Sequence, residues 1–542
     1  MPSVSHILVK HLVNWGVTHA FGIPGKPVTP LVFEMDQQGI SFILSKHECG
    51  AGFEAAGYAM TRNSLGVAIG TAGPGGINML TAAGQAKATN VPVLFITGQP
   101  PIMELGKVLG QDSTMFGTDL VKMFEPVTKF SARIDRGELL RSVWEHAIEQ
   151  AFTGVRGPVH LSIPSDVLGE VIEDFDLELP DQYPAAVSSN LDHVAAMIEA
   201  AHSPLLLVGG AVHALHAYGE LEAFAEKWQI PVATTPGGKG TFTSHHPLSL
   251  GPLGLGGHPY AEEYLRTGVD LMIVVGSQLS DLEVPGITPA LYPQHVIHFD
   301  HDARFIGKAL PIPTTPVLGN LQLNLQTLLK MPSAERLPRK LHLSLNEVAA
   351  TAEHITDYLG GQQVMTILRD ELPGDALMFG DAGSHSFYAI KYWDIEVPGT
   401  FYFEEVFATM GRAIGYAVGA KFGTPSRTVV SLTGDGCMFM SGTEVSTAVN
   451  YQTPVIFIVA NNQRIDMVDK GMARHLGKAV GTVYQVPLHA AKFGESMGAY
   501  AYRCWSEDEL RAAVRMALTH DNATVIEVMM DPEEIPPTMK RG

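Results

Sequence analysis

Residues 429–462 read VVSLTGDGCMFMSGTEVSTAVNYQTPVIFIVANN and contain two apolar runs that each end in polar residues. The first run, Val429–Thr433, is followed by Gly434-Asp435-Gly436, and the second, Pro454–Ala460, is followed by Asn461-Asn462. Continuous apolar runs of this length predict parallel strands that are buried on both faces of a sheet. The intervening residues are long enough for a crossover helix, which would bring both polar ends to one edge of that sheet.

The residues at these two strand ends fit a metal-bound diphosphate. Backbone N–H groups of Gly436 and Cys437 at the start of a helix form an anion site, and Asp435 offers a carboxylate oxygen beside it. The amide oxygen of Asn462 and a backbone carbonyl near Arg464 would add two further ligands for an octahedral Mg²⁺. A turn and a helix cap explain either motif alone, but the two motifs together at this spacing favour the metal site.

The GDG motif, a 24-residue spacer (437–460) and the NN motif together resemble the signature of thiamine-diphosphate-dependent enzymes. The whole stretch is similar to the acetolactate synthase branch, and Asp466-Met467-Val468 resembles its catabolic, flavin-independent members. The resemblance implies that thiamine diphosphate and Mg²⁺ are bound here, with Gly434 and Met467 added to the residues beside the cofactor.

Thiamine chemistry also needs a carboxyl group that faces the cofactor's pyrimidine ring and drives it to the imino tautomer. Such a group works best in an apolar pocket that raises its pKa. The segment FILSKHECGAGFEAAGYAM (42–60) offers Glu48, directly after a short strand and before a helix rich in small residues. A carboxylate stabilised by the helix dipole is the alternative explanation. In the resembled family the activating Glu follows a His in this pattern, so the resemblance assigns that role to Glu48.

Further site residues follow from the resemblance. It implies that Pro74 and Asn78, in the turn Gly70–Asn78, lie over the pyrimidine ring and that Pro24 lies near the substrate. It places Gln111 at the substrate end of the thiazolium ring. Lys26 follows the Pro24 loop, and its role stays open, with an exposed surface lysine as the favoured interpretation.

In the C-terminal part, the turn Asp381–Ser386 resembles the family's loop that grips the diphosphate, which implicates Gly383, Ser384 and His385. Met410 matches the apolar residue that bends the cofactor and brings its 4′-nitrogen against C2, a proximity effect, although methionine is also a common core residue. The resemblance further implies that the Ala408 carbonyl receives the amino group of the cofactor.

Strands alternate with helices along the whole chain, which predicts an α/β fold with three doubly wound parallel-sheet domains. Two stretches rich in Pro and in polar or charged residues, Leu177–Ser189 and Lys330–Ser344, are interpreted as linkers. The expected domains are residues 1–178, 190–332 and 348–542, which by resemblance are pyrimidine-binding, central Rossmann-like and diphosphate-binding. The central domain binds FAD in some branches of the family, and we expect no bound flavin in this chain.

Composition limits the classes of function. The chain of 542 residues has 36 Lys and Arg against 56 Asp and Glu, a net charge of −20, which argues against nucleic acid and anionic membrane surfaces as partners. The three cysteines, Cys49, Cys437 and Cys504, are too few for a disulfide framework. Neither a secretory signal nor an apolar run of about 18 residues is visible. We therefore expect a cytoplasmic enzyme.

The sequence thus favours a carboligase that decarboxylates a 2-oxo acid such as pyruvate and joins the acyl-anion equivalent to a second carbonyl, as acetolactate synthases do. The alternatives are a 2-oxo acid decarboxylase, an aldehyde lyase or ligase with the same cofactor, and a flavin-containing oxidase. Expected partners are small-molecule 2-oxo acids and aldehydes. The resemblance implies an active site between two subunits, in a homodimer or homotetramer. The natural donor and acceptor substrates stay open.

Overall fold

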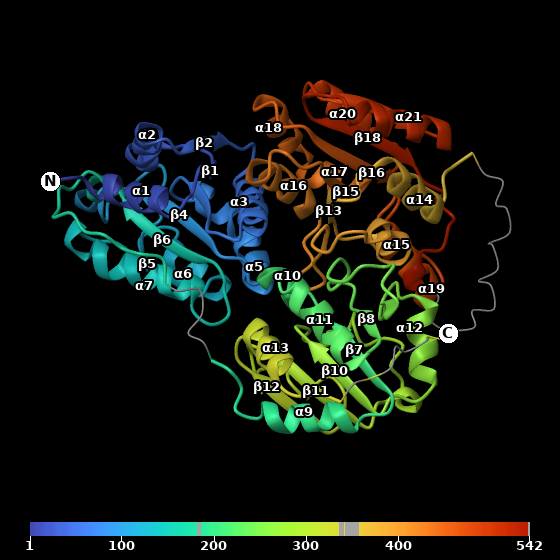
Figure 1. The fold of residues 1–542 in the computed structure, drawn as a ribbon. Coiled ribbons are helices and arrows are strands. Elements are labelled where there is room, and N and C mark those ends of the chain that lie inside the picture. Colours follow the sequence, from blue (N-terminus) through green and yellow to red (C-terminus); the bar gives the residue numbers. More distant parts are fainter. Residues whose placement is uncertain (181–185, 335, 337–340, 342–356, 540–542) are drawn as a thin grey trace.

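The computed structural model describes residues 1–180, 186–334, 336, 341 and 357–539. Three six-stranded parallel sheets, each flanked by helices, follow one another along the chain, and Figure 1 shows them as three separate layered units. The predicted α/β class with three doubly wound parallel sheets is confirmed. The predicted start of the third domain at residue 348 and much of the second linker lie outside the described residues.

The N-terminal sheet has the strand order β2-β1-β3-β4-β6-β5, with every neighbouring pair parallel. Its strands are β1 (His19–Gly22), β2 (Ser41–Leu44), β3 (Gly66–Gly70), β4 (Val93–Gln99), β5 (Phe130–Arg133) and β6 (Val159–Pro164). Its helices are α1 (Val4–Asn14), α2 (Thr29–Gln38), α3 (Glu48–Arg62), α4 (Pro74–Asn78), α5 (Leu80–Ala88), α6 (Leu120–Phe124), α7 (Leu140–Phe152) and α8 (Ser165–Leu168).

The central sheet has the order β12-β11-β10-β7-β8-β9 and is also parallel throughout. Its strands are β7 (Pro204–Val208), β8 (Val232–Thr234), β9 (Ser249–Pro252), β10 (Leu271–Val275), β11 (His295–Asp300) and β12 (Thr314–Leu318). Its helices are α9 (Leu191–Ala200), α10 (Ala211–Leu215), α11 (Tyr218–Trp228), α12 (Pro259–Arg266) and α13 (Leu321–Lys330).

The third sheet has the order β14-β13-β15-β16-β18-β17, again parallel. Its strands are β13 (Leu377–Gly380), β14 (Phe401–Phe403), β15 (Val429–Gly434), β16 (Val455–Asn461), β17 (Tyr500–Cys504) and β18 (Thr524–Met529). Its helices are α14 (Gly361–Glu371), α15 (Ser384–Tyr392), α16 (Arg412–Gly423), α17 (Asp435–Ser441), α18 (Val445–Asn450), α19 (Asp466–Leu476), α20 (Ala490–Ser496) and α21 (Glu507–Ala517). A 3-10 turn, η6 (Gly442–Glu444), joins α17 to α18.

In each sheet the strand order runs outward in opposite directions from one point, between β1 and β3, between β7 and β10, and between β13 and β15. Ligands of open parallel sheets bind outside the carboxyl ends of the strands at such a point. Pro24 lies in the loop after β1 and Pro74 begins the helix after β3, while His385 and Asp435 lie in the first turns of the helices after β13 and β15. The topology therefore places the predicted motifs at the positions where ligands bind.

Helices α3 and α16 pack closely and join the N-terminal domain to the third (Figure 1). Glycines make the close approach possible: a Cβ atom at Gly419 would lie 1.8 Å from the Glu54 carbonyl oxygen, and one at Gly57 would lie 2.1 Å from the Tyr416 carbonyl oxygen. Buried residues of both helices belong to one continuous apolar core that extends into both sheets. This helix pair fixes the two outer domains relative to each other.

We expect Gly419→Ala to lower the unfolding temperature, because the new methyl group would meet backbone atoms of α3 that cannot move aside; overpacking of this kind costs about 1–3 kcal/mol. Differential scanning calorimetry measures the shift. The matched control is Gly219→Ala in α11, where a Cβ atom would meet no heavy atom within 4 Å. That substitution should leave the unfolding temperature unchanged or raise it. Equal unfolding temperatures for Gly419→Ala and the unchanged protein would contradict the packing argument.

Candidate active site

Glu48 is the first residue of α3 and is buried, with 8% of its surface exposed. Its Oε2 accepts a hydrogen bond from Asn78 Nδ2 at 2.9 Å. A Cβ atom at Gly75, in the turn that follows β3, would lie 3.3 Å from Glu48 Oε1, so a glycine lets the turn approach the carboxyl group. The structure thus brings together Glu48, Asn78 and the turn that begins at Pro74, all at the carboxyl edge of the N-terminal sheet.

The Pro24 loop and Gln111 lie at the same edge. A Cβ atom at Gly25 would lie 2.3 Å from the Thr71 hydroxyl oxygen, which places the loop after β1 against the loop after β3. The Thr71 hydroxyl donates to Gln111 Oε1 at 3.2 Å. Pro24 and Gln111 are exposed in the single chain, and so is Lys26.

Asp435 begins α17 at the end of β15 and is buried. Its Oδ1 accepts the Gly436 N–H at 2.8 Å, and the N–H groups of Gln463 and Arg464 also face the carboxylate. Its Oδ2 has no hydrogen-bond partner among the described residues. Burial raises the pKa of Asp435 to about 7, and only backbone N–H groups act against this shift. A divalent cation would supply positive charge, so the site fits Mg²⁺.

The turn after β13 presents a second orphaned polar atom. The ring of His385 lies between two glycines: a Cβ atom would be 2.6 Å from its Cε1 at Gly383 and 3.1 Å from it at Gly434. Burial lowers the pKa of His385 to about 3, so the ring is neutral, and its Nε2 has no hydrogen-bond partner among the described residues. The hydroxyl group of Ser384 donates to Asp466 at 2.6 Å. A neutral ring with a free nitrogen at the start of α15 is compatible with a phosphate.

The loop before α16 is strained. Phe407 and Ala408 both have left-handed backbone conformations, with φ of 64° and 50°, which are uncommon for residues with side chains. The Thr409 N–H donates to Gln85 Oε1 at 3.0 Å, and the Gly411 N–H donates to the buried Asp381 carboxylate at 2.9 Å. Strain held by such contacts is typical of ligand-binding loops. It fits the predicted role of the Ala408 carbonyl.

Met410 lies against the GDG turn, since its Cε would be 3.6 Å from a Cβ atom at Gly436. Cys437 is buried, its Sγ donates to the Ala382 carbonyl at 3.4 Å, and burial raises its pKa well above the usual value. Asn462 directly follows β16 and is half-buried. The structure thus gathers the predicted residues of the third domain around the carboxyl ends of β13, β15 and β16.

Arg464 and Met467 take less direct positions. The Arg464 side chain pairs with Asp469 at 3.2 Å, so only its backbone remains available to a metal ion. Met467 packs against the apolar core of the third domain.

The sequence analysis missed Tyr484, whose hydroxyl oxygen would lie 2.8 Å from a Cβ atom at Gly436. Tyr484 comes from an irregular loop after α19 and belongs to no motif, so no pattern in the sequence points to it.

Within one chain the two groups of residues remain separate. The Glu48 carboxyl group contacts Asn78 of its own domain. The third domain also contacts the start of α3, but through Glu444 and not through Asp435. The structure shows no contact between Glu48 and Asp435 among the described residues of one chain.

A cavity of about 140 Å³ lies where the three domains meet, at the carboxyl ends of the central strands. Two buried carboxyl groups already occupy its hydrogen-bond donors. Glu405 accepts the Gly237 N–H at 2.9 Å, and Glu283 accepts the Ser277 hydroxyl at 2.7 Å. Burial and the neighbouring Glu283 raise the pKa of Glu405 well above its usual value. Buried acidic groups thus line this cavity at the carboxyl ends of the central strands.

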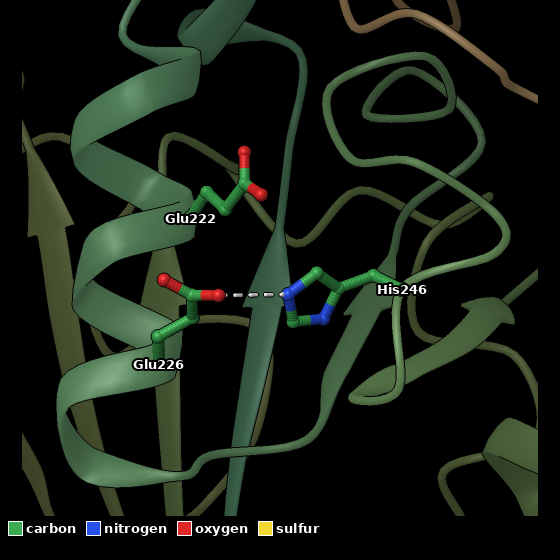
Figure 2. Close-up of side chains that lie close together, drawn as sticks. All are labelled: Glu222, Glu226 and His246. Atoms are coloured by element: carbon green, nitrogen blue, oxygen red, sulfur yellow. Dashed lines mark hydrogen bonds and ion pairs between the residues drawn. The ribbon is translucent and has the colours of Figure 1, made fainter.

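Glu222, Glu226 and His246 form a cluster with metal-ligating atoms on the central domain (Figure 2). His246 Nε2 lies 3.4 Å from a Glu226 oxygen, while its Nδ1 accepts the Leu248 N–H at 3.2 Å. The neutral ring therefore carries its hydrogen on Nε2, the atom that a metal would need. This arrangement describes a hydrogen-bonded pair rather than a metal site.

Comparisons with known proteins agree with this geometry. Three family models match: "Thiamine pyrophosphate enzyme, N-terminal TPP binding domain" at residues 2–123, the "central domain" at 191–328 and the "C-terminal TPP binding domain" at 381–528. The probable acetolactate synthase large subunit of Methanocaldococcus jannaschii is 30% identical, over 99% of this chain and 93% of that protein. The acetolactate synthase large subunit of Corynebacterium glutamicum is also 30% identical, over 96% of this chain and 85% of that protein.

Among solved structures, the benzoylformate decarboxylase of Polynucleobacter necessarius has a similar fold, with a TM-score of 0.86 at 22% identity. The likeness covers 99% of this chain and all of that one. The chain is thus a thiamine pyrophosphate enzyme. It belongs to the acetolactate synthase-like branch of that family.

We expect Asp435→Asn to weaken the binding of thiamine diphosphate in the presence of Mg²⁺ by at least about 10-fold, because loss of a ligand or its support typically costs this much metal affinity. Isothermal titration calorimetry at fixed Mg²⁺ measures the affinity. The matched control is Asp270→Asn, since Asp270 also accepts two backbone N–H groups but lies in the central domain. Equal affinities for Asp435→Asn and the control would contradict the assignment.

Proposed function

We propose that this chain is a thiamine-diphosphate- and Mg²⁺-dependent carboligase that decarboxylates a 2-oxo acid such as pyruvate and joins the acyl group to a second carbonyl. The full-length similarity to acetolactate synthase large subunits supports the reaction class. The observation that carries the proposal is the placement of Glu48, a buried acid held by Asn78 at the edge where the cofactor's pyrimidine ring would lie.

The proposed function assigns a separate role to each of the predicted site residues. Asp435, Asn462 and the backbone carbonyl of Arg464 would hold Mg²⁺, and the turns at Gly383 and Gly436 would bind the diphosphate. When bound, thiamine diphosphate supplies the carbon nucleophile and accepts the electron pair that remains after loss of CO₂.

Three further residues prepare the cofactor and the substrate. Glu48 holds a proton at the pyrimidine ring. Met410 would pack against the bound cofactor, which supplies the reacting groups. Gln111, exposed at the edge of the N-terminal sheet, would orient the substrate.

We further propose that two chains pair so that Glu48 of one chain faces Asp435 of the other. The separation of the two half-sites within one chain supports this assembly, and a homodimer is its smallest form. Exposed apolar side chains around both half-sites, at Phe407, Phe439 and Met440 in the third domain and at Met115 and Phe116 in the first, support burial at such an interface.

The carboxyl groups of Glu283 and Glu405 in the central cavity support a flavin-free enzyme.

None of the described helices is long and apolar enough to cross a membrane. The three cysteines are unpaired thiols, which is typical of a reducing compartment, and we propose a cytoplasmic enzyme.

The product identifies the reaction. Purified protein with thiamine diphosphate, Mg²⁺ and pyruvate, without added flavin, should release CO₂ and form 2-acetolactate, which mass spectrometry detects. Release of CO₂ with acetaldehyde as the product would show that the enzyme is a decarboxylase and not a carboligase. Absence of CO₂ release from pyruvate and from longer 2-oxo acids would contradict the proposal.

The role of Glu48 has its own test. We expect Glu48→Gln to slow the exchange of the C2 proton of bound thiamine diphosphate by orders of magnitude while the cofactor still binds, because the amide cannot hold the proton at the pyrimidine ring. Proton NMR after quenching in D₂O measures the exchange rate. Glu170→Gln is the control, since Glu170 lies in the same domain and bonds only to the backbone near Gly137 and Val4. Unchanged exchange in Glu48→Gln would contradict the assignment.

A further inference from the structure

A carboxylate of the third domain lies at the N-terminus of the helix that Glu48 begins. Glu444 ends η6 and is almost fully buried, with 1% of its surface exposed. Its carboxylate accepts the His47 N–H at 2.9 Å and the Lys46 N–H at 3.0 Å. A negative charge at this position is favoured by the helix dipole and satisfies backbone donors that have no partner within the helix. Glu444 thus holds the two residues that directly precede Glu48.

Two further groups complete the surroundings of Glu444. The Thr447 hydroxyl donates to its Oε2 at 2.6 Å. Glu54, one turn and a half further along α3, is fully buried, and burial together with the adjacent Glu444 raises the pKa of Glu54 well above its usual value. The raised pKa favours the protonated acid at Glu54, next to the Glu444 carboxylate, and Ser45 donates to Glu54 Oε2 at 2.5 Å.

The contact leaves no room for a side chain between Glu444 and the helix. A Cβ atom at Gly50 would lie 2.2 Å from Glu444 Oε1. The glycine therefore allows the carboxylate to reach the first turn of α3. The Glu444 carboxylate itself accepts from the Lys46 and His47 N–H groups and from the Thr447 hydroxyl, and a buried carboxylate held by several donors is fixed in place. Its rigidity extends to the backbone of Glu48, which is the next residue after the two N–H donors.

We propose that Glu444 is a positioning residue: its carboxylate fixes the start of α3 and thereby holds the Glu48 carboxyl group at the place where it meets the cofactor's pyrimidine ring. This inference rests on the proposed function of Glu48. Glu444 itself touches neither cofactor nor substrate in this arrangement, and it acts only through the backbone of Lys46 and His47.

The variant that tests the inference is Glu444→Gln, which keeps the shape of the side chain and removes the charge. We expect the exchange of the C2 proton of bound thiamine diphosphate and kcat to fall about 10- to 100-fold, since small displacements of a reacting group cost this much. The affinity for thiamine diphosphate with Mg²⁺ and the KM for pyruvate should stay within about threefold, because the residues that bind them are not changed. A purely structural defect would lower cofactor affinity as well.

The matched control is Glu54→Gln. Because burial favours the uncharged acid at Glu54, an amide there keeps the charge balance and can still accept from Ser45, so exchange should stay close to that of the unchanged protein. If Glu444→Gln fails to fold, Gly50→Ala tests the inference in its place. The new methyl group displaces the Glu444 carboxylate without removing its charge, so we expect slower C2 proton exchange while the cofactor still binds.

Each outcome is informative. Exchange at the normal rate in Glu444→Gln, or in Gly50→Ala where that variant is needed, overturns the inference. If the exchange rate falls as much in Glu54→Gln as in Glu444→Gln, the inference is overturned too. The rate would then depend on the pair of acids Glu54 and Glu444 and not on the position of Glu48. Normal exchange in Glu48→Gln would contradict the proposed function instead, so the two failures are distinguishable.

Discussion

The arrangement depends on the close packing of α3 against α16. Glycines at positions 57, 415 and 419 remove the side chains that would otherwise separate the two helix backbones. Glu48 begins one of these helices, and the strained loop with Ala408 and Met410 leads into the other. Their packing therefore decides which surfaces of the first and third domains face each other within a chain and which remain open for a second chain.

The two half-sites differ in their electrostatics, and the difference matches the chemistry. In the third domain, Asp435 is a buried carboxylate with an unpartnered oxygen, an arrangement that becomes favourable only when a cation binds. In the first domain, the buried Glu48 accepts one hydrogen bond, from the amide of Asn78. The proposed function thus assigns the metal ion and the proton-holding acid to separate domains.

The sequence predicted the strands Val429–Gly434 and Val455–Asn461 well, because strands buried on both faces appear as continuous apolar runs. It missed strands at the sheet edges, such as Phe130–Arg133 and Tyr500–Cys504, whose residues are partly exposed and form no such run. It also missed Glu444 and Tyr484. Both act through contacts between segments that are far apart in the chain, and no local pattern encodes such contacts.

The central claim is that one active site combines Glu48 of one chain with Asp435 of another. Mixing the two inactive variants, Glu48→Gln and Asp435→Asn, after reversible dissociation tests it directly. If the halves belong to different chains, every mixed dimer contains one site with both native residues, and about a quarter of the unmixed native activity should return at equal mixing. If both residues served one site within a single chain, no mixture would regain activity, and the account would be wrong.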